Sequence, residues 1–452
     1  MWGGRYNSNT PMTVLTSGWM TAVSAWRILF LLSLAGVFSS SVFLVLVLVA
    51  TRRRRRLAAA MASSVAAVPE KSLPFVTVLK PVHGMEPRLK ENIESFFQQE
   101  YPDFEIVFGA RSADNPALRV VEEMRTRYPH VKCRVVISGP PAWPNAKAFS
   151  LERITTGACA DYLVITDSDV AVAPDFLRNV VPPLLDPKIG LVTCLYRGVP
   201  AGGAWSLLEA LGMSVEMSSG VMVADLLEGM RFALGPGMAV RQDVLAKIGG
   251  FVSTKDYYSD DFVLGNLVWA AGYQVALSHH IVEHVLIPQS FLRTFGHQLR
   301  WHKSTRYSRP KGHLGTGLTF AMPFGILGMV SATSLGHPAL GWGLLALACA
   351  NRIVQSIAVG WGIIRDPRIL NYWWLYPLRD LFGFATWVGS YTSRRFFWRG
   401  EIYHFGDGGL IIPRSRVAEY ECEPFLPKSE GERVLVPRPH AAQHPNLSTD
   451  AG

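Results

Sequence analysis

A long uncharged segment near the start of the chain limits what this sequence can fold into. Residues 28–50 are 23 consecutive residues without a charged side chain. That is about the length a helix needs to cross a hydrocarbon core of roughly 30 Å. The sequence therefore excludes a purely soluble globule. Its composition, 49% hydrophobic and 17% charged, also excludes a disordered or low-complexity chain.

Five consecutive arginines, at positions 52–56, follow this segment and supply more than half of the formal net charge of +9. A cleaved signal peptide has a shorter apolar stretch with its positive block in front, so we interpret residues 1–51 as a tail and a signal-anchor helix. The positive-inside rule then places the N-terminus outside and the following basic linker, residues 52–72, in the cytosol. The basic charge thus indicates membrane topology and not nucleic-acid binding.

The middle of the chain, residues 73–312, has the alternating pattern of an α/β domain. Short β-branched runs have the composition of buried parallel strands and span residues 74–79, 104–109, 131–137 and 161–166. Amphipathic stretches between them predict helices at residues 87–99, 116–128 and 145–158. This alternation predicts a doubly wound sheet, in which ligands bind outside the carboxyl ends of the strands.

The chain becomes apolar again over residues 313–400, in segments at 315–336, 338–364 and 372–393. Three crossings would place the arginines after the last segment outside the cytosol, against the positive-inside rule. We therefore expect two spans plus a re-entrant or interfacial segment. The tail, residues 401–452, is expected to be disordered from about residue 424, where Pro and polar residues dominate.

Three charged residues lie inside these apolar segments: Arg352, Arg379 and Asp380. Such groups are costly in lipid unless they face protein or water. Two interpretations remain open, a role in substrate binding and a packing contact between Arg352 and Asp380.

Acidic residues follow two of the predicted strands. Asp167 and Asp169 come directly after the fourth strand, where paired carboxylates suit a hard divalent cation that bridges a diphosphate. An acidic turn or a helix N-cap is the alternative. Asp114 follows the second strand, and its alternative role is the N-cap of the helix at residue 116.

Two further motifs carry candidate chemistry. Asp260 and Asp261 begin a predicted helix, whose macrodipole favours ionised carboxylates, and an ionised Asp can act as a general base. His297, Arg300 and Trp301 lie in a basic, aromatic stretch just before the apolar region. The alternative for this stretch is a surface helix at the lipid boundary.

Taken together and in this order, the motifs resemble those of membrane-bound family 2-like glycosyltransferases. The closer resemblance is to the ceramide glucosyltransferase family, glycosyltransferase family 21, as a bacterial member, with hopanoid-type glycosyltransferases as close relatives. It extends from the first apolar segment to about Tyr403 and includes short stretches around Lys80 and Lys147. It implies an α/β GT-A (Rossmann-like) nucleotide-sugar domain plus transmembrane helices, acting on a UDP-sugar with inversion.

The resemblance also implies residue roles. In the donor site, Asp114 would contact the uridine and Asp167 the ribose or the metal. The remaining donor-binding candidates are Lys80 and Lys147. Asp169, with Asp167, would ligate Mg²⁺ or Mn²⁺ on the diphosphate.

At the reaction centre, the resemblance implies that Asp261 is the base, with Asp260 as an acidic neighbour. Arg300 and Trp301 would close over the departing diphosphate and the acceptor. His297 stands where the family has Gln or Arg, and His284 is a possible further metal ligand.

We therefore predict a multi-pass membrane glycosyltransferase of the bacterial inner membrane, with its catalytic domain in the cytosol. It would move a hexose, glucose first, from a UDP-sugar to the hydroxyl of a membrane lipid, ceramide favoured, in glycolipid and sphingolipid metabolism. One alternative is an (N-acetyl)hexosaminyltransferase acting on a hopanoid or other polyol lipid. An alternative of another class is a catalytically inactive membrane scaffold. The expected partners are the UDP-sugar, the lipid acceptor and the bilayer, and no nucleic acid.

Overall fold

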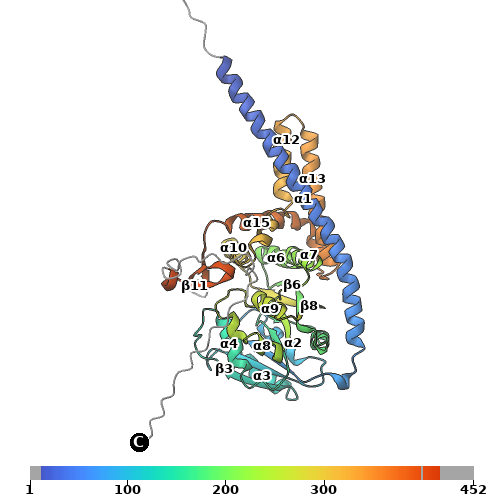
Figure 1. Cartoon of the computed structure of the whole chain (residues 1–452), viewed down its shortest axis with the longest axis vertical. Helices are drawn as coiled ribbons and strands as arrows, with labels where there is room; N and C mark the ends of the chain where they lie inside the picture. Colours follow the sequence, from blue (N-terminus) through green and yellow to red (C-terminus); the bar gives the residue numbers. More distant parts are fainter. Residues whose placement is uncertain (1–11, 399–400, 418–452) are drawn as a thin grey trace, which may run out of the picture. The chain divides into compact units, whose positions relative to one another are not determined.

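The computed structural model describes residues 12–398 and 401–417, which form two compact units (Figure 1). Each unit is assembled from separate stretches of the chain. The helical unit comprises Met1–Leu57, Arg197–Leu227 and Leu286–Ser393. The sheet unit comprises Ala58–Tyr196, Glu228–Val285 and Arg394–Gly452. Two parts of the range predicted as one α/β domain, residues 197–227 and 286–312, therefore cluster with the apolar helices.

The sheet unit is built on a mixed sheet. Within the described residues it has eight strands in the order β3-β2-β1-β4-β7-β6-β8-β5. The strands are β1 (Val76–Pro81), β2 (Phe104–Ala110), β3 (Lys132–Ile137), β4 (Tyr162–Thr166), β5 (Val170–Ala171), β6 (Ile189–Pro200), β7 (Gly237–Arg241) and β8 (Gln274–Leu286). Strands β3, β2, β1 and β4 are parallel, and β7 then pairs antiparallel with both β4 and β6. The predicted α/β class and its parallel strands are confirmed.

The predicted helices are also present, each slightly shorter than expected. They are α2 (Leu89–Phe97), α3 (Ala117–Arg127) and α4 (Ala146–Thr155). Shorter helices of the same unit are α5 (Phe176–Val180), α8 (Gln242–Lys247) and α9 (Asp260–Ala270).

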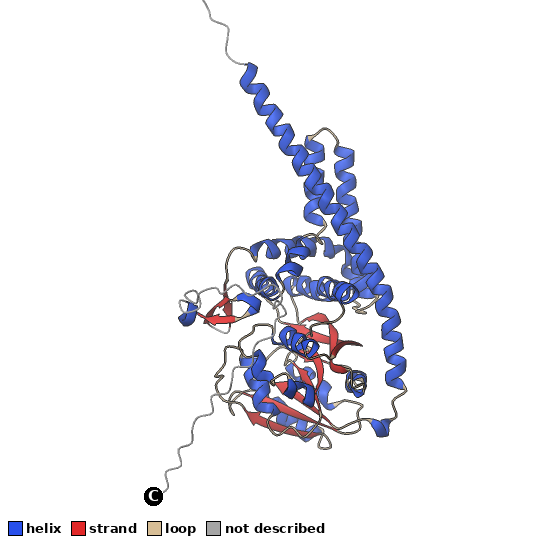
Figure 2. Ribbon diagram, in the orientation of Figure 1, coloured by secondary structure: helices blue, strands red, loops and turns tan. Residues whose placement is uncertain are grey.

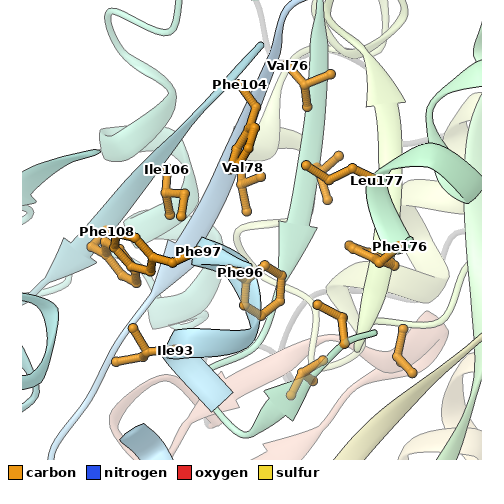
Figure 3. Close-up of a cluster of buried hydrophobic side chains, with 14 of the residues drawn as sticks. Val76, Val78, Ile93, Phe96, Phe97, Phe104, Ile106, Phe108, Phe176 and Leu177 are labelled. Carbon is orange, nitrogen blue, oxygen red and sulfur yellow. The ribbon is translucent and has the colours of Figure 1, made fainter. Parts of the chain in front are cut away.

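The core of the sheet unit lies between α2 and the parallel strands (Figure 3). Phe97 of α2 stacks on Phe108 of β2 with 6.1 Å between the ring centroids. Burying one such side chain contributes about 1.5–3 kcal/mol, which is why α2 stays fixed against the sheet. The prediction of a buried strand at residues 131–137 is wrong, because β3 is an edge strand. Its Val135 and Ile137 are 36% and 42% exposed.

A small C-terminal sheet packs against the loop that precedes α9. It contains β9 (Arg395–Trp398), β10 (Glu401–Phe405) and β11 (Ile411–Pro413). The ring of Tyr258 contacts Phe396 and Phe405, each at 5.4 Å between centroids. The Ile411 amide also donates to the Asp256 carbonyl at 2.7 Å. These contacts fix the loop that leads into Asp260. The predicted disorder from about residue 424 lies outside the described residues.

The helical unit begins with one continuous helix, α1 (Met12–Ala66), 55 residues long. The block of five arginines lies within this helix, and Arg53 pairs with Asp225 at 2.5 Å. Most of the segment expected as a linker is therefore helical, since Ala, Arg, Leu and Met all favour helix. The apolar signal-anchor segment is part of Ser24–Ala66, which is long and apolar enough to cross a membrane.

The helical unit also contains a helix pair, α12 (Met322–Ser334) and α13 (Pro338–Gln355), which pack against each other and against α15 (Tyr376–Gly389). The others are α6 (Ala204–Leu211), the π-helix η3 (Gly212–Met217), α7 (Ser218–Glu228), α10 (Phe291–Ser308), α11 (Pro310–Gly317), the π-helix η5 (Ser356–Trp361) and α14 (Ile369–Tyr372). Figure 2 shows α6, α7 and α15 lying across the long axis of the α12–α13 pair.

By length and composition, the described residues contain three helices able to cross a membrane, or four if the bent pair α11–α12 counts as one span. They are Ser24–Ala66, Ala204–Glu228 and Pro338–Trp361. Ala204–Glu228 is not evident in the sequence because acidic residues interrupt it. Helix α15 has 14 residues and is about 21 Å long, too short to cross the core. The re-entrant or interfacial placement of residues 372–393 stays a prediction.

The charged residues inside the apolar segments form a buried ion pair. Arg352 Nη1 lies 3.0 Å from Asp380 Oδ1, and both side chains are at most 3% exposed. Asp380 Oδ2 also accepts the amides of Ala321 and Met322 at the start of α12. The packing contact between Arg352 and Asp380 is confirmed.

We expect Asp380→Ala to lower the free energy of unfolding by about 3–5 kcal/mol, because it leaves the Arg352 charge buried and unpaired. The measurement is equilibrium unfolding of the purified protein in detergent. Glu122→Ala is the matched control, since the exposed Glu122–Arg125 pair should contribute less than about 1 kcal/mol. Equal losses in the two variants would contradict this prediction.

Candidate active site

The structure brings several predicted site residues together around one ammonium group. Lys147, in the first turn of α4, places its Nζ 2.6 Å from Asp167 Oδ1 and 3.7 Å from Asp260 Oδ2. Asp167 directly follows β4, and Asp260 is the first residue of α9. Three segments distant in sequence therefore meet where β4 ends, as expected for an α/β sheet.

The charge of Lys147 is held by these acids. Burial disfavours the ammonium, but Asp167, Asp260 and Asp261 outweigh it and raise the pKa of Lys147 above its ordinary value. Lys147 is therefore a permanent cation that offsets part of the negative charge of the surrounding carboxylates.

Asp261 is fixed by two backbone amides. Its Oδ2 accepts Gly235 N–H at 2.6 Å, and its Oδ1 accepts the amide of Phe262 at 2.8 Å. A Cβ at position 235 would lie 3.0 Å from Asp261 Oδ2, so glycine permits this close approach.

The pKa of Asp261 is shifted in the direction opposite to the one that the helix macrodipole favours. Burial and the adjacent Asp260 raise the pKa of Asp261 to about 6, against the opposing effects of Lys147 and of the backbone amides. Desolvation and like charge therefore outweigh the helix terminus. Asp261 remains mostly ionised at neutral pH but is close to its titration range, which suits a general base.

Asn145 is a site residue that sequence reasoning missed. As the N-cap of α4, its Oδ1 accepts the amides of Lys147 and Ala148 at 2.9 and 3.0 Å. Its Nδ2 donates to the Tyr257 carbonyl at 2.8 Å and to Asp260 Oδ1 at 3.3 Å. One side chain thus connects the helix that carries Lys147 to the loop that carries the acids. An Asn at the start of a predicted helix is the sequence signal for its capping role.

Lys80 lies beneath the acidic loop. It is fully buried in β1, and its Nζ donates to the Asp167 carbonyl at 2.7 Å and lies 3.9 Å from the centre of the Phe96 ring. Burial lowers its pKa to about 7, although the charges of Asp169 and Asp167 oppose this. In the structure, Lys80 therefore supports the backbone of the loop that carries Asp167. Apolar residues flanking Lys80 on a buried strand could have indicated this burial.

Asp169 and His284 face each other across neighbouring strands. Val170 of β5 pairs with His284 of β8, and Asp169 Oδ2 lies 3.6 Å from His284 Nε2. Asp169 Oδ1 and His284 Nδ1 are both buried without a hydrogen-bond partner. A carboxylate oxygen and an imidazole nitrogen are suitable ligands for Mn²⁺, and Asp169 alone would suit Mg²⁺.

The described part of the chain contains no group of three or more His, Cys, Asp or Glu arranged to hold a metal ion. This is compatible with a divalent cation held by one or two protein ligands and completed by substrate phosphates. The orphaned Asp169 oxygen beside His284 fits such a cation.

Asp114 lies apart in the exposed loop between β2 and α3. A hydrogen bond with Ser112 holds its pKa below the usual value. It is not the N-cap of α3, a position taken by Pro116. Instead, Asn115 Oδ1 accepts the amides of Gly84 and Ala117, which ties the loops after β1 and β2 together.

Tyr196 of β6 is a second residue that the sequence did not reveal. Its half-buried ring lies 5.8 Å from the His284 ring. Burial and the charges of Asp261, Asp167 and Asp169 raise its pKa, so the phenol keeps its proton and can donate. No motif marks this residue, because its proximity to the acids depends on the order of the strands.

The remaining predicted residues belong to the helical unit. His297, Arg300 and Trp301 lie on α10, and the rings of His297 and Trp301 are 4.8 Å apart. His297 Nδ1 lies 2.6 Å from Glu209 Oε1 on α6. Glu209 was not singled out in the sequence, because an acid in an apolar helix has no motif around it.

Comparison with known proteins gives a family match over most of the chain. The model of glycosyl transferase family 21 matches residues 31–411. Ceramide glucosyltransferase 3 of Caenorhabditis elegans is 22% identical over 354 residues, which cover 76% of this chain and 75% of the relative. Ceramide glucosyltransferase 1 of the same organism is 24% identical over 236 residues, covering 52% and 50%.

Two further similarities are to a bacterial protein and to a solved structure. The probable glycosyltransferase YdaM of Bacillus subtilis is 22% identical over 242 residues, which cover 52% of this chain and 56% of that protein. The mannosyltransferase PcManGT from Pyrobaculum calidifontis, in complex with GDP-Man and Mn²⁺, is 18% identical with a TM-score of 0.45. That similarity covers 78% of this chain and 99% of the other.

The bonds of Asn145 generate a stability prediction. Asn145→Ala should lower the free energy of unfolding by about 1 kcal/mol for the lost cap and by a further ~1 kcal/mol for the bonds to Tyr257 and Asp260. Asn266→Ala is the control, because it removes only a bond to the Phe262 carbonyl within α9. Chemical unfolding of both variants measures the difference, and similar losses would show that Asn145 has no special role.

Proposed function

Because the chain belongs to glycosyl transferase family 21, we propose that it transfers a hexose, glucose first, from a UDP-sugar to the hydroxyl of a membrane lipid, with ceramide as the favoured acceptor. The family match over residues 31–411 carries this proposal, since it includes the acids around Lys147 and helix α10. The chain is therefore a glycosyltransferase. Its sheet unit has the mixed α/β sheet of the predicted GT-A class. The relatives named as ceramide glucosyltransferases support the choice of acceptor.

In the proposed reaction, Asp261 is the general base. Its carboxylate would take the proton of the acceptor hydroxyl while that oxygen attacks the anomeric carbon and the diphosphate leaves, which inverts the configuration. The amides of Gly235 and Phe262 fix the carboxylate, so little reorganisation is needed when the proton moves.

The donor would be held by residues of the segments that follow β2 and β4 and of the first turn of α4. Asp114 would bind the uridine, and Asp167 with Lys147 would lie near the ribose and the diphosphate. Mg²⁺ or Mn²⁺ would be held by Asp169, with Asp167 or His284, and would offset the charge of the diphosphate. Arg300 and Trp301 of α10 would contact the leaving group and the acceptor. Lys80 would act on the donor only by supporting the loop of Asp167.

A lipid acceptor is supported by the apolar surface of the helical unit. Phe38 of α1, Trp342 of α13 and Trp374 after α14 are 72%, 61% and 56% exposed. Exposed aromatic and aliphatic side chains of this kind suit a bilayer and its interface. With the arginine block on the cytosolic side, we place the sheet unit in the cytosol and the protein in a bacterial inner membrane.

The decisive experiment incubates the purified protein with UDP-glucose or UDP-N-acetylglucosamine, Mn²⁺ and vesicles containing ceramide or a hopanoid polyol, and detects glycolipid by mass spectrometry. We expect hexosylceramide, a loss of about 10²–10⁴-fold in Asp261→Asn, and loss of divalent-cation dependence together with activity in Asp169→Ala. Asp243→Asn, at an exposed carboxylate paired with Arg241, is the matched control. Transfer to no lipid would support the inactive scaffold instead.

The raised pKa of Asp261 predicts a pH dependence. The base must be ionised, so kcat/KM should rise as pH increases through about 6 and be lost below it. Asp260→Asn removes the like charge and should move this midpoint to lower pH. Rates measured between pH 5 and 8 test both statements. An acid midpoint that is unchanged in Asp260→Asn would argue against Asp261 as the base.

A further inference from the structure

The backbone amide that binds Asp261 belongs to a short segment of the sheet unit that leads into β7. Asp261 Oδ2 accepts Gly235 N–H at 2.6 Å, and β7 begins two residues later at Gly237. Pro236 lies between the two glycines and has no N–H to donate to a neighbouring strand. The strand ladder is therefore interrupted at this point, and the orientation of the Gly235 amide depends on contacts of another kind.

Thr193 of β6 provides such a contact. Its side chain is fully buried, and its Oγ1 accepts Leu234 N–H at 2.8 Å and donates to the Leu234 carbonyl at 3.1 Å. A hydroxyl has one donor and two acceptor positions, so a single side chain binds both backbone groups of Leu234. The Leu234 carbonyl and the Gly235 N–H belong to the same peptide. Thr193 therefore binds the peptide whose other side binds Asp261.

Helix α9 holds the start of the same segment. A Cβ at Gly265 of α9 would lie 2.3 Å from the Ala233 nitrogen, so the helix closely approaches the segment backbone. The rings of Phe232 and Phe262 stack with 5.7 Å between their centroids. The segment thus lies between β6, which carries Thr193, and the helix that carries the proposed base.

We propose that Thr193 is a positioning residue for Asp261, whose hydroxyl orients the Leu234–Gly235 peptide so that its N–H donates to the carboxylate. This inference rests on the proposed function, because Thr193 would act on the reaction through the proposed base. A trans peptide is planar, with its C=O and N–H on opposite sides, so the bond donated to the carbonyl also sets the direction of the N–H. The same bond polarises the peptide and strengthens its N–H as a donor.

The first test replaces only the hydroxyl. Thr193→Val has a similar shape but leaves both backbone groups of Leu234 without this partner. We expect kcat to fall by about 10–10²-fold with the KM for the UDP-sugar little changed, because the base is misplaced while the donor site is intact. Thr193→Ser keeps the hydroxyl and should retain most of the activity.

Thr77→Val is the matched control. Thr77 is also fully buried on a strand, and its Oγ1 donates to Glu105 Oε1 at 2.8 Å. It lies near the start of β1, away from the carboxyl ends of the parallel strands where the acids meet. Thr77→Val should therefore lower stability and leave kcat unchanged. An equal fall of kcat in Thr77→Val and Thr193→Val would overturn the proposal.

The acid limb of the pH–rate profile is a readout that a purely structural role would not move. The bond from Gly235 lowers the pKa of Asp261, so weakening it in Thr193→Val should move the midpoint of this limb to higher pH, and Thr77→Val should not move it. The substitution retains the titratable groups that interact with Asp261, which are Asp260 of α9, Lys147 of α4 and Tyr196 of β6.

Hydrogen exchange separates this inference from the proposed function, because it needs no transfer reaction. Peptides that cover residues 232–237 should exchange faster in Thr193→Val than in the wild-type protein or in Thr193→Ser. That result supports the role of the hydroxyl even if no lipid is glycosylated. Unchanged exchange would overturn the proposal. So would a Thr193→Ser variant as impaired as Thr193→Val, since it would show that side-chain volume matters and the hydroxyl does not.

Discussion

The contact between Lys147 and its surrounding carboxylates is the interaction on which the candidate site depends. Several acids converge where the parallel strands end, and their mutual repulsion would separate the loops that carry them. Lys147, 2.6 Å from Asp167, offsets that repulsion, while Asn145 and Lys80 hold the two loops from either side. The raised pKa of Asp261 follows from the same crowding, since Asp260 is its direct neighbour.

The helical unit also contains carboxylates whose negative charges must be compensated, and there each of them is paired with its own basic residue. Its acids are buried or half-buried among apolar helices, where an unpaired charge would be more costly than at a surface. Asp380 and Glu216 are paired with arginines, and Glu209 is paired with His297. Because Glu209 also binds Gln298, the helix that carries Arg300 and Trp301 is anchored through polar contacts and not only through apolar packing.

Local patterns predicted the elements well. The parallel strands and the intervening helices occur where β-branched runs and amphipathic periodicity indicate them, because both signals arise within a short stretch of chain. The edge position of β3 was missed, since composition cannot distinguish a buried strand from one that has a neighbour on a single side. The contacts of Lys80, Tyr196 and Glu209 were missed for a related reason. Each is defined by what a distant segment places beside it.

The sequence by itself determined the anchor segment, the α/β class, the family and the acids that carry the candidate chemistry. These follow from properties of neighbouring residues and from motif order. Only the tertiary structure decided which charges are paired, which are buried and how far the pKa of Asp261 is raised. Burial and proximity depend on strand order and helix packing, and a pKa depends on burial and proximity. The identity of the candidate reactive groups therefore follows from short stretches of sequence, whereas their ionisation depends on the folded structure.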